Sequence, residues 1–199
     1  IYTGANCDAS ISATDIDGGS NDPDGDVLNY SVSNTGPFSV GTHVVTLTVS
    51  DGEYIDTCSA TVTVIDSINP TAVCQDITVQ LDANGEIVIT SVDIDGGSTD
   101  NCTVVSLDIS PNSFDCTNFG TNAVVLTVTD NIGNISTCIA TVTVADTIAP
   151  TAVCTDIIVQ LEADGTATIA AGDVDNGSFD NCAIQSLEID IDSFDCSMV

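Results

Sequence analysis

The chain contains the segment Asp93-Ile94-Asp95-Gly96-Gly97-Ser98-Thr99-Asp100-Asn101-Cys102 and repeats it twice more in altered form. The earlier version begins at Asp15, and the later version runs from Asp173 to Cys182. Gly and Ser between the aspartates predict tight turns, because glycine adopts positive φ at little cost. These turns crowd carboxylates together, and the 199-residue chain has no Lys or Arg to neutralise them. The sequence therefore predicts a bound cation. Calcium fits best, because it takes roughly six to eight oxygen ligands in flexible geometry.

Cysteines that recur at a constant spacing of 80 residues indicate a tandem array of repeats. The matching pairs are Cys74 with Cys154, Cys102 with Cys182, and Cys116 with Cys196. We predict a complete repeat at residues 71–150. Residues 1–70 form an earlier repeat that lacks its first strand, and residues 151–199 form the N-terminal part of a third repeat.

The apolar residues favour strands over helices. They make up 43% of the chain and are mostly Val, Ile and Ala with Thr between them. Alternating polarity and turn residues predict strands in the complete repeat at residues 76–81, 86–92, 104–109, 113–116, 122–129 and 136–144. Since no segment keeps a helical period over three turns, we predict an all-β fold of tandem immunoglobulin-like β-sandwiches.

The charge and the cysteines limit the partners and the compartment. A net charge of −30 argues against binding to nucleic acid or to anionic membranes, because both need Lys and Arg. The sequence has no run of about 18 apolar residues that could span a membrane. The nine cysteines lack the spacing of zinc sites, which indicates disulfides in an oxidising compartment. We therefore expect a secreted protein, either extracellular or on the cell surface.

Several stretches of the complete repeat resemble the hyalin-repeat (HYR) family of immunoglobulin-like modules, which occur in tandem in large bacterial surface proteins. They are Thr71-Ala-Val-Cys74, Ser98-Thr-Asp-Asn-Cys102 and residues 126–144. In the first repeat, residues 21–30 instead resemble the acidic loop of bacterial cadherin-like repeats. Both resemblances imply an extracellular adhesive or structural role, and the family supplies no catalytic residues.

In a sandwich of this topology, the acidic loop lies at the same end as the incoming linker and the last hairpin turn. We therefore predict calcium at or near each junction between repeats. The candidate ligands are Asp93, Asp95 and Asp100 with Asp130 and Asp66; Asp173, Asp175 and Asp180 with Asp146; and Asp15, Asp17, Asp22, Asp24 and Asp26 in the first repeat. The alternative is that these loops are solvated and that each aspartate caps its own turn.

The cysteines also predict a pairing. Cys102 and Cys116 are both absent from the first repeat, which favours a bond between them, and Cys182 with Cys196 follows by analogy. Cys74 would then pair with Cys138, at the starts of neighbouring parallel strands, and Cys154 would need a partner beyond residue 199. Counting favours Cys7 with Cys58, whereas strand direction favours an upstream partner for Cys58.

The first functional hypothesis is a segment of a calcium-stabilised, disulfide-bonded fibre, serving as an adhesin stalk or a filament subunit. Its partners would be neighbouring repeats and identical chains. The alternative is a glycan-binding or protein-binding module of a secreted enzyme, which the low aromatic content of 4% disfavours. We predict no enzymatic activity, because His43 has no nucleophile near it in sequence. Ser67 and Thr147 lie in weak Asp-Ser/Thr-aliphatic signals for O-glycosylation on the linkers.

Overall fold

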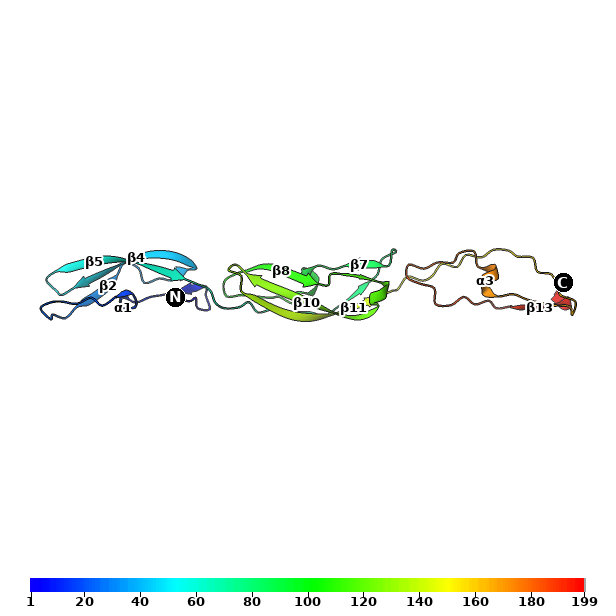
Figure 1. Cartoon of the computed structure of the whole chain (residues 1–199), viewed down its shortest axis with the longest axis horizontal. Coiled ribbons are helices and arrows are strands. Elements are labelled where there is room, and N and C mark those ends of the chain that lie inside the picture. The colour runs from blue at the N-terminus through cyan, green and yellow to red at the C-terminus, as the bar shows by residue number, and fades with distance from the viewer. Residues whose placement is uncertain (199) are drawn as a thin grey trace. The chain divides into compact units, whose positions relative to one another are not determined.

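A computed structural model describes residues 1–198, and its first repeat is built mainly from antiparallel strands (Figure 1). The elements are β1 (Asp8–Ala9), α1 (Ala13–Ile16), β2 (Asn29–Val32), β3 (Phe38–Ser39), β4 (Gly41–Ser50) and β5 (Ile55–Val64). Strands β2, β4 and β5 form one antiparallel sheet in that order, and β1 pairs with β3. Ile11, Phe38, Val45, Val62 and Val64 pack together as the core of this repeat.

The second repeat contains the predicted strands in the predicted order. Its elements are β6 (Ile77–Gln80), β7 (Glu86–Val88), α2 (Ser91–Ile94), β8 (Val104–Ser110), β9 (Ser113–Asp115), the 3-10 turn η1 (Cys116–Asn118), β10 (Gly120–Asp130) and β11 (Ile135–Ala145). One sheet has the order β6-β11-β10-β8, with β6 parallel to β11, and β7 pairs with β9. The all-β prediction is confirmed.

Strand β10 has the alternation expected of a strand with one buried face. Val124, Leu126 and Val128 are fully buried, while Val125 between them is exposed. In the third repeat the described elements are β12 (Thr166–Thr168), α3 (Ala171–Val174), β13 (Ser193–Asp195) and the 3-10 turn η2 (Cys196–Met198), and β12 pairs with β13.

The strand predicted at residues 86–92 is too long. It ends at Val88, and the one-turn helix α2 follows at Ser91. The cause is Asp93, whose carboxylate accepts hydrogen bonds from the backbone N–H and the hydroxyl of Thr90 and so caps the start of the helix. Asp15 does the same for α1 through Ser12, and Asp173 for α3 through Ala170.

Contacts divide the chain into two compact units. Unit 1 comprises Ile1–Gln75, Ile94–Ser110 and Val125–Ile139, and unit 2 comprises Asp76–Asp93, Pro111–Val124 and Ala140–Val199. The repeat boundaries at residues 70 and 150 stay a prediction. In residues 1–198, none of the helices has the length and apolar character that a membrane crossing needs.

Candidate metal site and disulfide links

Asp66, on the linker after β5, is the most buried carboxylate of the first junction, which we define as residues 3–7, 66–68 and 100–103. Its side chain is 3% exposed. Its Oδ1 accepts hydrogen bonds from the Thr3 hydroxyl at 2.9 Å, the Ile68 N–H at 3.1 Å and the Asn101 amide at 3.4 Å. Its Oδ2 is buried and has no hydrogen-bond partner among the described residues. One oxygen therefore holds the carboxylate in place, and the other is a bare oxygen, by which we mean a buried oxygen without a hydrogen-bond partner in residues 1–198.

Asp100, in the acidic loop, also accepts hydrogen bonds with only one of its two oxygens. Its Oδ2 accepts hydrogen bonds from the Cys102 N–H at 2.8 Å and the Thr103 N–H at 3.2 Å. Its Oδ1 is buried without a partner among residues 1–198, and so is the side-chain oxygen of Asn101. The first junction thus collects three bare acceptor oxygens, from Asp66, Asp100 and Asn101, inside a chain that contains no Lys or Arg.

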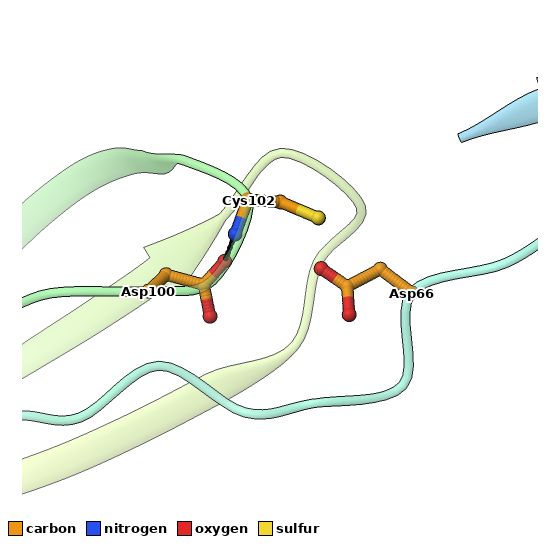
Figure 2. Close-up of side chains that lie close together, drawn as sticks. All are labelled: Asp66, Asp100 and Cys102. Atoms are coloured by element: carbon orange, nitrogen blue, oxygen red, sulfur yellow. Dashed lines mark hydrogen bonds between the residues drawn. The ribbon is translucent and has the colours of Figure 1, made fainter. Parts of the chain in front are cut away.

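The ligand atoms of Asp66, Asp100 and Cys102 all lie within 4.8 Å of one another, and Figure 2 shows the Asp66 carboxylate facing the other two. At an effective dielectric constant of 20, two carboxylates this close repel each other by about 3 kcal/mol. The Cys102 sulfur is oxidised in a disulfide, so it is not a thiolate ligand. The available donors are therefore oxygens, which select a hard cation such as calcium rather than zinc.

The second junction, defined as residues 82–85, 116, 146–148 and 180–182, contains the corresponding Asp-Asn-Cys loop and linker aspartate 80 residues later. Asp180 Oδ1 and the side-chain oxygen of Asn181 are buried without partners in the described part of the chain. Asp180 Oδ2 accepts from the Cys182 N–H at 3.2 Å, and the Asn181 amide donates to Asp146 Oδ1 at 3.2 Å. Asp146 Oδ1 also accepts from the Ile148 N–H, as Asp66 does from Ile68.

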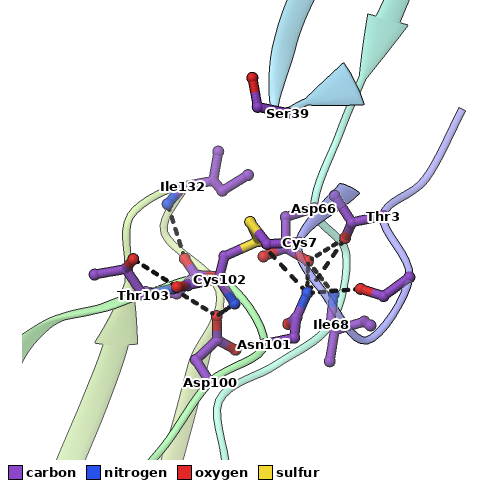
Figure 3. Close-up of a disulfide and its surroundings, with 12 residues drawn as sticks. Thr3, Cys7, Ser39, Asp66, Ile68, Asp100, Asn101, Cys102, Thr103 and Ile132 are labelled. Atoms are coloured by element: carbon purple, nitrogen blue, oxygen red, sulfur yellow. Dashed lines mark hydrogen bonds between the residues drawn. A yellow bond between two sulfur atoms is a disulfide. The ribbon is translucent and has the colours of Figure 1, made fainter. Parts of the chain in front are cut away.

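Each junction also contains a disulfide. Cys7 is bonded to Cys102 in the first junction, as Figure 3 shows, and Cys116 is bonded to Cys182 in the second. The Asn101 amide beside the first disulfide donates to the Gly4 carbonyl at 3.2 Å. The Asn181 amide beside the second donates to the Asp82 carbonyl at the same distance. Both Asp-Asn-Cys loops are thus held by one covalent bond and by the asparagine that precedes the cysteine.

These disulfides correct three predicted pairings. Cys102 with Cys116, Cys182 with Cys196, and Cys7 with Cys58 are wrong, whereas Cys74 with Cys138 is confirmed. The physical reason lies in the turn at Gly85, where an added Cβ would lie 2.7 Å from the Cys116 sulfur. Cys7 occupies the corresponding turn of the first repeat, also with positive φ. The turn cysteine therefore replaces the strand-end cysteine as the partner of the next loop.

The thiols of Cys58, Cys154 and Cys196 are free and exposed in residues 1–198. Cys58 and Cys154 correspond in sequence to Cys138 and Cys74, which are bonded to each other in the second repeat. The expectation that Cys154 pairs beyond residue 199 stays a prediction. Ser67 and Thr147, the predicted glycosylation sites, are both exposed.

Most other predicted ligands cap turns. Asp17, Asp95 and Asp175 accept hydrogen bonds from the Ser three residues later, and Asp22 accepts from the N–H groups of Asp24, Gly25 and Asp26. The Ser98 hydroxyl and N–H lower the pKa of Asp95, and the Thr90 N–H and hydroxyl lower that of Asp93. Among residues 1–198, the close carboxylate group contains Asp66 and Asp100 but not Asp93, Asp95 or Asp130. Calcium binding by these and by the first-repeat aspartates stays a prediction.

Asp130 is 3% exposed and organises the turn between β10 and β11. Burial favours its protonated form, but hydrogen bonds from the N–H groups of Ile132, Asn134 and Gly133 and from the Asn134 amide outweigh burial and lower its pKa. The Asn134 amide also lies 3.4 Å from the carbonyl oxygens of Asp66 and Ile68. Asp130 therefore supports the first junction through Asn134.

The asparagines were missed by reasoning from the sequence, which searched for carboxylates. Asn101 and Asn181 each have a buried side-chain oxygen without a partner in residues 1–198, and each donates through its amide to the preceding turn. The available signal was their position directly before a cysteine in both complete Asp-Asn-Cys motifs.

No protein-family model matches the chain. A search of curated proteins also finds no match. Among solved structures, the chain is similar to human protocadherin-24 EC1-2, with 18% identity and a TM-score of 0.32 over 63% of this chain and 85% of that chain. The fibronectin(III)-like modules of Clostridium thermocellum CbhA match at 13% identity and a TM-score of 0.29, over 60% of this chain and 77% of that chain.

The endo-fucoidan hydrolase MfFcnA4 from glycoside hydrolase family 107 matches at 16% identity and a TM-score of 0.25, over 63% of this chain. The match spans 24% of the hydrolase. The chain thus has distant structural similarity to cadherin and fibronectin-III-like domains. Because every one of these TM-scores is below 0.5, only the chain's own geometry supports conclusions about its function.

Proposed function

We propose that this chain is a structural or adhesive segment of a secreted, hyalin-repeat-like fibre whose repeats are joined by disulfides and calcium. One observation carries the proposal. In both junctions, a disulfide and an asparagine fix the Asp-Asn-Cys loop to the repeat before it, and bare buried oxygens lie beside that attachment. The Asp-Asn-Cys loop is attached in this way twice, 80 residues apart, which indicates a rule for joining repeats.

The disulfides supply the covalent part of this joint. The bonded cysteines are separated by 95 residues in the first junction and by 66 in the second. Closing loops of this length in the unfolded chain corresponds to about 4.5 kcal/mol of stabilisation each in the chain-entropy model. Such bonds persist outside the cell, so an extracellular or cell-surface location follows from the proposal.

Calcium supplies the electrostatic part. A divalent cation at Asp66 and Asp100 would neutralise both carboxylates and give their bare oxygens, with that of Asn101, a partner. Since such an ion binds the folded chain only, it stabilises by about 2.7 kcal/mol when its free concentration is a hundred times its dissociation constant. A segment joined in this way would keep its repeats in register and resist unfolding, which is what an adhesin stalk or filament subunit requires.

The test is thermal unfolding of the intact, oxidised chain with calcium and with excess chelator at constant ionic strength. We expect calcium to raise the midpoint and sodium at equal ionic strength to fail. Asp66→Asn should clearly reduce the calcium-dependent shift, because it removes a carboxylate ligand of the first junction. Asp108→Asn is the matched control, since it removes the same charge from an exposed position on β8. An equal calcium shift in both variants would contradict the calcium part of the proposal.

A further inference from the structure

The two occupied junctions define what the preceding repeat must offer to an incoming loop. It offers a turn carbonyl that already accepts from its own turn, namely Gly4 O from the Cys7 N–H and Asp82 O from the Gly85 N–H. The same carbonyl then accepts the loop asparagine at 3.2 Å. Beside the carbonyl lies a sulfur that bonds to the loop cysteine. We name this combination of turn carbonyl and sulfur the socket.

The third repeat contains a socket of the same geometry. The Glu162 carbonyl accepts from the Gly165 N–H at 3.0 Å, as Asp82 does from Gly85 at 2.9 Å. Cys196 Sγ lies 3.7 Å from the Gly165 carbonyl oxygen, and Cys116 Sγ lies 3.7 Å from that of Gly85. Asp195 pairs with Thr166 across β12 and β13, as Asp115 pairs with Glu86 across β7 and β9. The difference is that Cys196 is an exposed free thiol.

We propose that this third socket is a covalent docking site for an Asp-Asn-Cys loop. The ligand is a peptide loop whose asparagine amide donates to the Glu162 carbonyl and whose cysteine forms a disulfide with Cys196. The inference rests on the proposed function, because it takes the joint between repeats as the model for the ligand. It adds that the socket and the loop motif are sufficient for recognition, and that recognition does not require calcium.

The chemistry is thiol–disulfide exchange. The Cys196 thiol loses its proton to solvent, and its thiolate attacks the sulfur of a loop cysteine that is already in a mixed disulfide. The new bond joins Cys196 to the loop, and the other thiol leaves with the electron pair of the broken bond. With two free thiols instead, a disulfide-class oxidant takes up the two electrons and two protons.

The test uses a synthetic peptide with the sequence of residues 176–186, whose cysteine carries a 2-thiopyridyl group. The protein is the full oxidised chain with Cys58→Ser and Cys154→Ser, so that Cys196 is the reactive thiol. A second peptide has alanine in place of the asparagine that corresponds to Asn181. Release of 2-thiopyridone gives the rate. We expect the asparagine peptide to react roughly threefold to tenfold faster, as one hydrogen bond to a recognition carbonyl would give.

The matched control is the chain with Cys154→Ser and Cys196→Ser, which leaves Cys58 as the thiol. Both peptides should react with Cys58 at equal rates, because no socket adjoins it. Equal rates for the two peptides at Cys196 would overturn the inference, as would the same preference at Cys58. The reactions are run in chelator, so a failure here is distinguishable from a failure of the calcium titration.

Discussion

Aspartate has two different roles in this chain, and the partners of its two oxygens separate them. In the turns, a carboxylate such as Asp95 accepts hydrogen bonds from its own loop and is partly exposed. At the first junction, Asp66 and Asp100 each accept hydrogen bonds with one oxygen, and the other is buried without a partner in residues 1–198. Only the second arrangement leaves a charge that the protein itself does not compensate. Calcium dependence should therefore follow Asp66 and Asp100.

At the scale of single residues, Asp130 should make the folded chain lose stability in acid. Its pKa is lowered in the folded chain, since hydrogen bonds to the carboxylate outweigh burial. Its contribution is therefore present above the unfolded value of about 3.9 and is lost as the pH falls through the lower folded pKa. Urea unfolding between about pH 5 and pH 2.5 should show a smaller loss of stability for Asp130→Asn than for the unmodified chain. An equal loss of stability with falling pH in Asp130→Asn and in the unmodified chain would contradict the prediction.

Gly85 makes a second prediction at this scale. It has φ of +77°, and an added Cβ would lie 2.7 Å from both Asn181 O and the Cys116 sulfur. Gly97 has φ of +99°, with nothing within 4 Å of an added Cβ. Gly97→Ala should therefore cost about 1 to 2 kcal/mol, from backbone strain alone. Gly85→Ala should cost clearly more, because it also obstructs the loop. Urea unfolding of both variants tests this. Equal costs would contradict the prediction, because they would mean that the atoms around Gly85 move aside without loss of stability.

At the scale of elements, the strands were predictable and the one-turn helices were not. Alternation over β8, β10 and β11 is long enough for the period of two to identify each strand. Helices α1, α2 and α3 span four residues each in the described chain, too few to show a helical period. They depend on a single capping carboxylate, which in the sequence looks like one more acidic loop residue.

The disulfides show where the sequence was misleading. The absence of both Cys102 and Cys116 equivalents from the first repeat looked like the loss of one bond within a repeat. In the structure, these cysteines belong to two different links. Cys7 fills the role of Cys116, but it directly precedes β1, whereas Cys116 directly follows β9. The alignment of Cys7 with Gly85 was visible in the sequence. The proximity of Gly85 to Cys116 was not, because it depends on the pairing of β7 with β9.

The link between Cys116 and Cys182 is the prediction that belongs to this scale. Peptide mapping of the oxidised chain without reduction should recover residues around Cys116 joined to those around Cys182. Recovery of Cys182 joined to Cys196 would contradict the structure. Cys116→Ser should lower the free energy of unfolding by about 4 kcal/mol, given the 66-residue separation. Cys58→Ser is the matched control, since it removes an exposed free thiol, and should change stability little.

At the scale of the whole molecule, the compact units do not coincide with the sequence repeats. Unit 1 joins the first repeat to Ile94–Ser110 and Val125–Ile139 of the second, and unit 2 takes the remainder. The first junction and its disulfide lie within unit 1, and the second junction lies within unit 2. Each junction is therefore part of a compact unit rather than a hinge between units, which indicates that loosening a junction loosens part of the adjoining repeat.

Hydrogen exchange can test this coupling directly. Because contiguous packing defines cooperative opening, Asp66→Asn should speed amide exchange in Ile94–Ser110 and Val125–Ile139 together with the first repeat, and leave Pro111–Val124 nearly unchanged. Asp146→Asn should do the reverse and speed exchange in residues 76–93 and 111–124 of unit 2. The measurement is exchange followed by mass spectrometry, with disulfides reduced only after quenching. If either variant speeds exchange evenly across residues 71–150, the repeat itself is the cooperative element, and the junctions join modules that open independently.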